Sequence, residues 1–544
     1  MRPGRDERRV NLSAYGSARL AGSLSGPRRE TRKRIRTAAS FLLWTAALLS
    51  IPAHSACAAN VSVPADGDLQ EALNRARPGD TVVLAPGATY VGNFLLPATA
   101  GSVYITVRTG GESANLARPG QRILPVRSDR LAKLKSPNAN PALRTAAGAH
   151  HWRLQLLEFL PTAVPAADII RLGDGGTAQH DLSSVPHDLA IDRCYIHGDP
   201  ARGQKRGIAL NSGATTIIDS YISDIKAVGQ DSQAIAGWNG PGPYTIENNY
   251  LEGAGDNFLL GGSDPAIQGL VTQDVVFRRN HLAKPAAWRT QNWQVKNIFE
   301  LKNARRVLVE GNVMEYVWRD AQSGYAILLT PRNQDGKSPW SVVEDVTIRR
   351  NVIRHAGAGI TITGEDTNFP SNPARRVKIV DNLFYDIDGK AWGGPGVFAL
   401  IGDGPADIAI EHNTVIQSGN IITAFGGTKD APKTVTGLVF RDNLIRHNEF
   451  GVIGSDRGVG MSTFDAYFPD AVFTANTIDG GDAARYPKGN AFISDADFTR
   501  MFVDAAANDY RLAPNSRARA AGSDGKDLGA DVVAIAQALG TRQR

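Results

Sequence analysis

Several charged residues between positions 296 and 403 have side chains suited to acid–base chemistry on an anionic substrate. An arginine can hold a carboxylate through two parallel hydrogen bonds, and a lysine can act as a base where neighbouring cations lower its pKa. Paired carboxylates can serve as general acid and base. The residues concerned are Lys296, Glu300, Lys302, Arg332, Glu365, Asp366 and Asp403. They can act together only if the fold places distant parts of the sequence side by side.

A recurring asparagine indicates a fold of that kind. It follows an apolar strand pattern such as Val346-Thr347-Ile348, and successive copies are 30 to 39 residues apart. The copies are Asn249, Asn280, Asn312, Asn351, Asn382, Asn413, Asn443 and Asn476. A repeat of this length is typical of one supersecondary unit stacked along an axis. Side chains at equivalent positions of successive units then form rows, and the charged residues fall in one such sector.

The repeat predicts an all-β fold, a single-stranded right-handed parallel β-helix of about 10 to 13 coils. Short strands with alternating apolar residues can bury their apolar face only by stacking on the next copy. The asparagine amide both donates and accepts, so stacked copies can satisfy one another at an internal turn. Cys194 and Ser220 fill the same position in earlier repeats and extend the series toward the N-terminus.

The chain divides into four segments. Residues 1–58 read as a leader and secretory signal peptide, because a basic stretch precedes an apolar run too short to span a membrane and then an Ala-x-Ala site. Residues 59–135 are expected to form the N-terminal cap and first coils, with a short capping helix over 68–77. Residues 136–480 hold the β-helix repeats, and 481–544 form a closing segment. The mature chain is expected to be secreted or periplasmic, without a transmembrane anchor.

Charge and cysteine content narrow the choice of partners. The formal net charge is +6, but the first 58 residues hold 11 of the 60 Lys and Arg and 3 of the 54 Asp and Glu. The remainder carries 49 basic and 51 acidic side chains, a net charge of −2, which argues against nucleic-acid binding. Cys194 is the one cysteine beyond the predicted cleavage site, so no internal disulfide is expected. The mature protein is expected to be a monomer.

Three insertions between neighbouring repeats, at residues 284–295, 316–325 and 332–342, are rich in aromatic side chains. Exposed aromatic faces suit sugar rings, although tryptophans folded over the coils as lids would give the same pattern. The predicted substrate-binding residues lie in these loops and at adjoining strand ends: Lys296, Trp288, Trp293, Trp318, Tyr325, Trp340, Asn333 and Asp403.

Alternation within one strand predicts which charged side chains reach the surface. In Phe299-Glu300-Leu301-Lys302 the apolar side chains should point inward, so Glu300 and Lys302 should point outward. Arg332 is expected about one coil from Lys302, and Asp366 about one coil further. The charged residues should therefore share one face of the solenoid.

Two short runs, Glu300-Leu301-Lys302-Asn303 and Leu328-Leu329-Thr330-Pro331-Arg332-Asn333, resemble the catalytic coil pair of the alginate lyase and chondroitinase B group of polysaccharide lyases. The wider repeat pattern resembles secreted bacterial, pectate-lyase-like β-helix proteins. The resemblance implies that Lys302 is the base, that Arg332 binds the leaving group or a carboxylate, and that Glu300 is a calcium ligand. Glu365 and Asp366 are the other predicted metal ligands. The second glutamate of the group's metal-binding pair is absent.

The expected function is β-elimination in a polysaccharide that contains uronic acid. Removing the weakly acidic proton beside a carboxylate requires a cation to neutralise that carboxylate and the developing enolate. Two alternatives stay open. Asp366 and Asp403, on adjacent coils, could stand about 5 Å apart, as in a retaining glycosidase. A non-catalytic, glycan-binding surface solenoid would use the same aromatic loops without an activated base.

Overall fold

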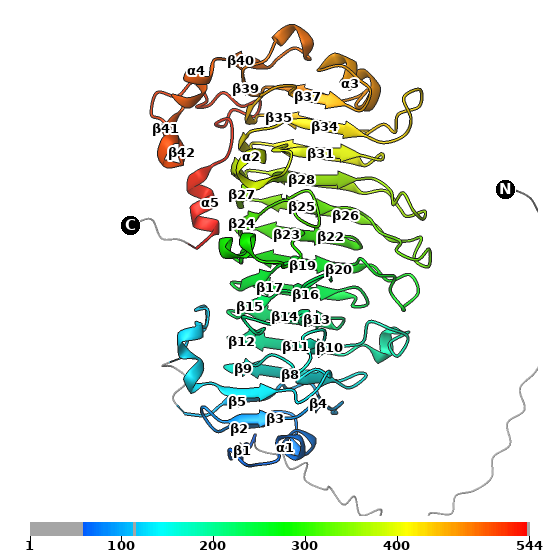
Figure 1. Ribbon diagram of the computed structural model, residues 1–544, viewed down its shortest axis with the longest axis vertical. Helices are drawn as coiled ribbons and strands as arrows, with labels where there is room; N and C mark the ends of the chain where they lie inside the picture. Colours follow the sequence, from blue (N-terminus) through cyan, green and yellow to red (C-terminus); the bar gives the residue numbers. More distant parts are fainter. Residues whose placement is uncertain (1–57, 112–115, 541–544) are drawn as a thin grey trace, which may run out of the picture. The chain divides into compact units, whose positions relative to one another are not determined.

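The computed structural model describes residues 58–111 and 116–540, which form three long parallel sheets stacked coil upon coil (Figure 1). The fold is the predicted right-handed parallel β-helix. From β2 to β37, successive strands belong to sheet A, sheet B and sheet C in turn, one of each to a coil. The predicted signal peptide lies outside the described residues. In the described part of the chain, no helix has the length and apolar character needed to cross a bilayer.

Sheet A has 14 strands. Its strands are β1 (Asn60–Val63), β2 (Thr81–Leu84), β5 (Ile105–Thr109), β8 (His150–Gln155), β11 (His187–Asp192), β14 (Gly213–Ile218), β17 (Gly242–Glu247), β20 (Thr272–Arg278), β23 (Ala304–Glu310), β26 (Val343–Arg349), β29 (Arg375–Val380), β32 (Ala406–Glu411), β35 (Val439–Arg441) and β38 (Val472–Thr474).

Sheet B also has 14 strands. Its strands are β3 (Thr89–Val91), β6 (Ala132–Lys135), β9 (Leu157–Phe159), β12 (Tyr195–His197), β15 (Tyr221–Ile225), β18 (Tyr250–Gly253), β21 (His281–Ala283), β24 (Val313–Val317), β27 (Val352–Ala356), β30 (Leu383–Ile387), β33 (Thr414–Gln417), β36 (Leu444–Arg446), β39 (Thr477–Asp479) and β40 (Ala491–Ile493).

Sheet C has 12 strands and carries the residues singled out above. Its strands are β4 (Phe94–Leu96), β7 (Leu143–Thr145), β10 (Asp168–Leu172), β13 (Arg206–Leu210), β16 (Gln233–Gly237), β19 (Asp256–Leu260), β22 (Asn297–Leu301), β25 (Tyr325–Leu329), β28 (Ala358–Thr363), β31 (Ala399–Gly402), β34 (Ile422–Phe425) and β37 (Val452–Gly454).

The core is a column of apolar side chains at equivalent positions of successive coils. Phe258 of β19 pairs in register with Phe299 of β22, and their ring centroids lie 5.4 Å apart. Phe277 of sheet A packs against both rings. The three side chains are fully buried. Because a register slip of one residue would expose this column, the core also fixes which side chains point outward.

The repeated asparagine forms a buried ladder at the turn between sheets A and B. The Nδ2 group of Asn312 donates to Oδ1 of Asn351 at 2.9 Å, and Oδ1 of Asn312 accepts from Nδ2 of Asn280 at 3.1 Å. Each amide thus bonds the next coil, as the sequence predicted. Ser220 continues the series, since its backbone N–H donates to Oδ1 of Asn249 and its hydroxyl accepts from the N–H of Cys194.

Both ends of the described stack are covered by other elements. Helix α1 (Leu69–Arg75) buries Leu69 and Leu73 over the first coil, and Asp68 caps it by accepting from the N–H of Glu71 at 2.9 Å. At the other end lie α3 (Met461–Tyr467) and α4 (Asp495–Thr499), and the chain then continues through β41 (Phe502–Asp504), β42 (Asp509–Leu512) and α5 (Val532–Ala538). The predicted capping helix is confirmed.

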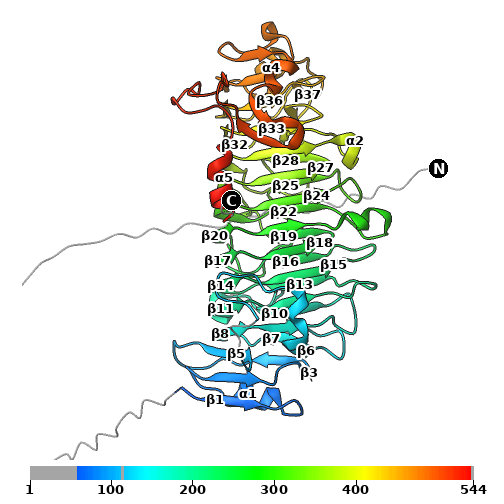
Figure 2. The same ribbon diagram turned by 90° about the vertical axis from the view of Figure 1, so that its left-hand side faces the viewer.

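Two segments run along the outside of the A–B turns. The N-terminal strap, residues 116–131, donates from the N–H of Ile123 to the carbonyl of Asp219 at 2.8 Å, and Arg122 reaches the carbonyl of Asn248. The C-terminal strap, residues 494–540, is the red segment that turns back beside the coils in Figures 1 and 2.

The C-terminal strap bonds several coils in turn. The hydroxyl of Ser523 donates to Asp442, the N–H of Ala530 to Thr414, and the N–H of Asp531 to Asp381. As the strap proceeds toward its end, its partners lie progressively earlier in the chain.

Candidate functional site on sheet C

The outer face of sheet C brings charged side chains of several coils together. Asp256 pairs in register with Asn297, and Leu259 pairs with Glu300. The core positions between them are filled by phenylalanine and leucine, so the polar side chains are directed to the outer face. Lys302 follows directly after β22. These positions define one strip across adjacent coils.

Two carboxylates of this strip are fully buried. Asp256 and Glu300 are 0% exposed; neither oxygen of Asp256 accepts a hydrogen bond from the described residues, and Glu300 meets the ammonium of Lys302. The Oδ1 atom of Asn297 also has no partner. Burial, together with the negative charge of Glu300, raises the pKa of Asp256 to about 7 against the opposing charges of nearby lysines. Unpaired buried oxygens of this kind are costly in a folded protein and point to a ligand or a reactive site.

Three lysines surround the two carboxylates. The Nζ atom of Lys302 lies 2.8 Å from Oε1 of Glu300. Lys296 and Lys284 also act electrostatically on Asp256. Together these five residues are called the carboxylate–lysine cluster: Asp256, Lys284, Lys296, Glu300 and Lys302.

Lys284 is the most deeply placed of the three lysines. Its Nζ donates to the carbonyl of Gly253 at 2.6 Å, to the carbonyl of Gly255 at 3.3 Å and to Oδ1 of Asn257 at 2.8 Å. Burial lowers the pKa of Lys284, and the charge of Asp256 opposes that change. The Lys284 side chain is fully buried, so it supports the cluster from beneath and does not meet solvent.

Two glycines make room for Lys302. A Cβ atom on Gly261 would lie 2.9 Å from Cβ of Lys302 and 2.6 Å from the backbone nitrogen of Asn303. A Cβ atom on Gly262 would lie 3.2 Å from Cδ of Lys302. Both glycines have positive φ angles, 90° and 84°. The side chain of Lys302 therefore lies across the glycine pair of the preceding coil.

Arg332 stands beside Lys302 on the next coil, as the sequence predicted. Its backbone N–H donates to the carbonyl of Lys302 at 2.9 Å. Its guanidinium Nη1 lies 3.1 Å from Oδ1 of Asp366, and 29% of its side chain is exposed. Asp366 also accepts from the N–H of Asn333 at 2.9 Å. The arginine is thus held by a buried carboxylate while part of it faces solvent.

The structure does not bring the three predicted metal ligands together. Glu300 meets Lys302, Asp366 meets Arg332, and Glu365 meets Lys433 at 3.3 Å. Within the described residues, no group of three or more His, Cys, Asp or Glu side chains could hold a metal ion.

The carboxylate–lysine cluster offers hard oxygen donors but does not fit calcium. Asp256, Asn297 and Glu300 carry oxygen atoms of the kind that calcium takes, but lysine ammonium groups occupy the space around them. The ammonium of Lys302 already lies against Glu300, and the charges of Lys284 and Lys296 act on Asp256. Positive charge is therefore supplied by lysine side chains.

The predicted aromatic platforms are mostly lids. Trp288 is 4% exposed, and the Lys226 ammonium lies 4.8 Å from its ring centroid and 5.0 Å from that of Trp293. Trp318 is buried in the core, and the Nε1 group of half-buried Trp340 donates to a loop carbonyl. These contacts hold the loops against the coils, which was the alternative considered for the tryptophans.

Of the other predicted substrate-binding residues, some lie at the site on sheet C and others hold loops in place. Tyr325 begins β25, the strand that pairs with β22 in sheet C. Burial raises the pKa of Tyr325. Lys296 lies just before β22 and pairs with Asp231 at 2.8 Å. Asn333 is buried, with its Nδ2 donated to a loop carbonyl, so its amide serves the loop.

A second hollow lies further along sheet C, around Asp403. Its volume is about 690 Å³, and its lining includes Asp366, Asp403, Lys429 and Lys433. Burial raises the pKa of Asp403, Glu365 adds to the rise and Lys433 opposes it. Asp366 is ion-paired with Arg332, so Asp366 and Asp403 do not form a free acid–base pair.

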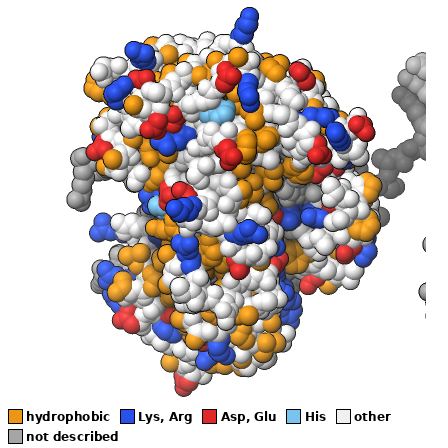
Figure 3. Space-filling model, turned by 45° about the horizontal axis from the view of Figure 1, so that its top comes forward, with side chains coloured by type: hydrophobic (Ala, Val, Ile, Leu, Met, Phe, Trp, Pro, Cys, Tyr) orange, Lys and Arg blue, Asp and Glu red, His pale blue; other side chains and the backbone are white. Residues whose placement is uncertain are grey.

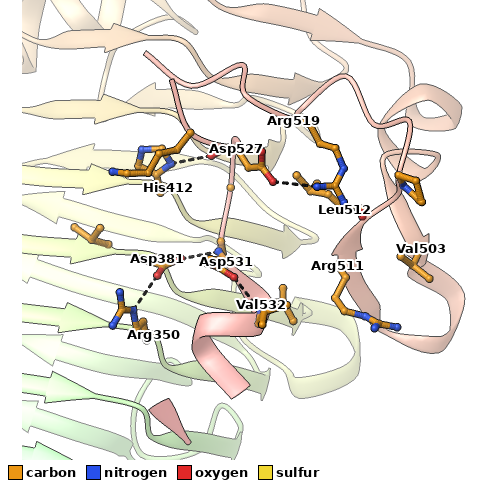
Figure 4. Close-up of a pocket in the computed structure, with 16 residues that line it drawn as sticks. Arg350, Asp381, His412, Val503, Arg511, Leu512, Arg519, Asp527, Asp531 and Val532 are labelled. Atoms are coloured by element: carbon orange, nitrogen blue, oxygen red, sulfur yellow. Dashed lines mark hydrogen bonds and ion pairs between the residues drawn. The ribbon is translucent and has the colours of Figure 1, made fainter. Parts of the chain in front are cut away.

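Another cavity, of about 960 Å³, lies between the C-terminal strap and the A–B turns (Figure 4). Its charged side chains pair with one another: Arg350 donates to Asp381 at 3.2 Å, and Arg519 lies 3.5 Å from Asp527. It is remote from sheet C and contains no unpaired reactive group of the kind found there. The cavity is a space beneath the strap.

Sequence reasoning missed three members of the site: Asp256, Lys284 and Asn297. A signal for Asp256 was present, because the strands beginning Asp256-Asn257-Phe258 and Asn297-Ile298-Phe299 align residue by residue. Lys284 carried no such signal, since it lies in a loop of irregular length.

Comparison with solved structures supports the fold. The alginate lyase AlyGC of polysaccharide lyase family 6 superposes with a TM-score of 0.53 and 14% identity, over 87% of this chain and 58% of that one. An arginine-to-alanine mutant of AlyGC superposes with a TM-score of 0.51 and 14% identity, over 89% of this chain and 59% of that one. This chain thus spans less than two thirds of the length of AlyGC. Neither a protein-family model nor a curated protein matches the sequence. At this identity the likeness shows a shared fold.

Proposed function

We propose that the protein is a polysaccharide lyase that cleaves a glycan containing uronic acid by β-elimination. The observation that carries the proposal is the carboxylate–lysine cluster beside Arg332 on one face of a β-helix. The cluster supplies the two things elimination needs: a proton acceptor and positive charge beside a carboxylate. The fold shared with an alginate lyase supports the same conclusion.

In the proposed reaction Lys302 is the base. The neutral amine form of Lys302 accepts the proton, and Glu300, 2.8 Å from its Nζ, holds the side chain in place. That amine takes the proton from the carbon beside the uronate carboxylate. The electron pair of the broken C–H bond forms the new C=C bond, and the C–O bond to the neighbouring sugar breaks. The departing oxygen takes its proton from water.

Arg332 and Lys296 hold the uronate carboxylate in this mechanism. Arg332 is positioned by Asp366, and part of its guanidinium is exposed, so it can bind a carboxylate bidentately. Lys296 is mostly buried and lies just before β22, at the opposite end of the strand from Lys302. Positive charge at both ends of the strand would stabilise the enolate as it forms. Calcium has no step in this scheme.

The remaining expectations form part of the same proposal. The substrate is an acidic polysaccharide, and the protein works outside the cytoplasm as a secreted or periplasmic monomer. The basic and apolar leader supports export. Figure 3 shows acidic and basic side chains intermixed on the displayed surface, in keeping with the net charge of −2 after residue 58. Specificity for an acidic glycan would therefore come from local charge.

A hydrolase using Asp366 and Asp403 is less well supported, because Asp366 is bonded to Arg332 and Asn333. A glycan-binding solenoid remains the other alternative. Incubating the mature protein with alginate, polygalacturonate, chondroitin and heparan separates the three. A lyase gives the ultraviolet absorbance of an unsaturated uronate, and a hydrolase gives reducing ends without it. Binding without products from any of these glycans would overturn the proposal.

A further inference from the structure

A basic hollow lies on sheet C several coils before the carboxylate–lysine cluster. Its volume is about 360 Å³. It is lined by small residues at its base and by charged and aromatic residues at its rim, among them Asp168, Arg171, Asp174, Lys205, Arg206 and Trp238. Three of these side chains are basic and two are acidic, so the hollow has one positive charge in excess.

Arg206 is fixed in place before any ligand arrives. Its Nη1 group donates to Asp168 at 2.9 Å, and its Nη2 group donates to Gln233 at 2.9 Å. Its guanidinium carbon lies 5.1 Å from the ring centroid of Trp238, which is itself held by a hydrogen bond to the carbonyl of Gly175. An arginine held on three sides loses little conformational entropy when it binds an anion.

The other two cations are more available. Arg171 shares the carboxylate of Asp168 with Arg206, and 40% of its side chain is exposed. The Lys205 ammonium has no hydrogen-bond or ion-pair partner among the described residues, although its backbone N–H donates to Pro165. One carboxylate thus serves two guanidinium groups while an ammonium stands unpaired beside them. This excess of donors suits a ligand carboxylate.

The hollow is aligned with the proposed reaction centre. Arg171 pairs in register with Ala209, Ala209 with Ala236, Ala236 with Leu259, and Leu259 with Glu300. Arg171 and Glu300 therefore occupy the same row of sheet C, four strands apart. Four strand spacings amount to about 19 Å. An extended chain lying along the axis could reach both.

We infer that this hollow is a remote subsite that binds a uronate carboxylate of the same glycan, several sugar units from the cleaved bond. The inference rests on the proposed function, because it takes the ligand to be that substrate. The subsite holds the polymer parallel to the helix axis and adds affinity only when the glycan is long enough to span both positions. The protein should accordingly prefer polymers to short oligosaccharides.

The test compares Lys205→Ala and Arg171→Ala with the unchanged mature protein. Binding of alginate polymer and of its trisaccharide is measured by calorimetry, and turnover by ultraviolet absorbance. Each substitution should weaken polymer binding about five- to twentyfold, as expected for losing one charged contact. Trisaccharide turnover should stay unchanged. Lys135→Ala, at an exposed lysine of sheet B, is the matched control and should change neither.

The outcomes separate the subsite from the reaction. If a substitution weakens the binding of polymer and trisaccharide equally, or weakens neither, the subsite proposal is wrong. If no glycan is cleaved but Lys205→Ala still weakens polymer binding, the proposed reaction fails and the subsite stands. If glycan is cleaved and Lys205→Ala binds polymer normally, the subsite alone fails. Thermal unfolding of each variant shows whether a loss reflects misfolding.

Discussion

The backbone N–H of Arg332 donates to the carbonyl oxygen of Lys302 at 2.9 Å, although the two residues are separated by a whole coil. Their side chains therefore leave the same edge of sheet C, next to each other. The loop of residues 318–324, between β24 and β25, lies between the two residues in sequence, and β22 and β25 still pair in register. The pairing of the proposed base and its cationic partner is thus set by the ladder of the sheet.

Replacing Lys302 with alanine should lower turnover by about 10²- to 10⁴-fold, the usual contribution of a positioned acid–base group. Substrate binding should change far less, because Arg332 and Lys296 remain. Initial rates from ultraviolet absorbance measure the effect. Lys378→Ala, at an exposed lysine on sheet A, is the control and should retain full activity. A Lys302→Ala protein that turns over normally would remove Lys302 from the mechanism.

Asp366→Asn should lower kcat/KM roughly tenfold, since it weakens a charge-assisted bond that positions Arg332. The products should still be unsaturated. Arg332→Lys should do more harm, because lysine cannot hold a carboxylate bidentately. If Asp366 were instead an acid or base of a hydrolase, the asparagine variant would be almost inactive and the wild-type products would lack unsaturation.

Stability should fall as pH rises through the range in which Asp256 titrates. Its folded pKa is raised to about 7, mainly by burial, above the unfolded value of about 3.9. The folded state therefore binds the proton more tightly, and the stabilisation present below pH 4 is lost as pH approaches 7.

Asp256→Asn should remove this slope and raise the midpoint of thermal unfolding at pH 8 relative to wild type. Unfolding midpoints of both proteins at pH 4.5, 6 and 8 give the comparison. An asparagine variant less stable than wild type at pH 8 would show that the lysines around Asp256 bind its charged form more strongly than burial opposes it.

Chelation should leave turnover unchanged, because Lys284, Lys296 and Lys302 supply the positive charge around the two buried carboxylates. The measurement is the initial rate before and after dialysis against EDTA. Activity that disappears on dialysis and returns with added calcium would contradict the lysine assignment and restore a metal to the site.

Asn312→Ala should destabilise the protein by roughly 1–3 kcal/mol for each buried group left unpaired. The groups concerned include the N–H of Asn280, the carbonyl of Phe277 and Oδ1 of Asn351. Denaturant unfolding measures the loss. Asn292→Ala removes an exposed asparagine and should change little. Equal stability of the two variants would mean that the ladder contributes no net stability.

The fold could be predicted because its signal repeats. Asn312, Asn351 and Asn382 lie at the same turn of successive coils, so the turn can be recognised even where one repeat departs from the pattern. The alternation around Glu300 and Lys302 predicted that both reach the surface, but Glu300 is 0% exposed. Alternation within one strand does not show what neighbouring coils cover.

The chemistry of the site was harder to predict because it depends on pairs from different coils. Asp256 and Glu300 are 44 residues apart in sequence, and Lys284, which acts on Asp256, lies in a loop of irregular length. The tryptophans were difficult to place for the same reason. Trp288 and Trp293 pack around Lys226, which is distant from both in sequence. Spacing cannot reveal such contacts.

The two straps end almost against each other. The N-terminal strap reaches Asn248, and the last described residue of the C-terminal strap, Gly540, lies close to Arg279, one coil later. We expect coils braced by the same strap to loosen together, so that the solenoid opens most readily at the seam between the two straps. The seam coil runs from Asn248 to Arg279 and contains Asp256. Opening there would expose Asp256, beside the proposed reaction centre, while each set of braced coils stays intact.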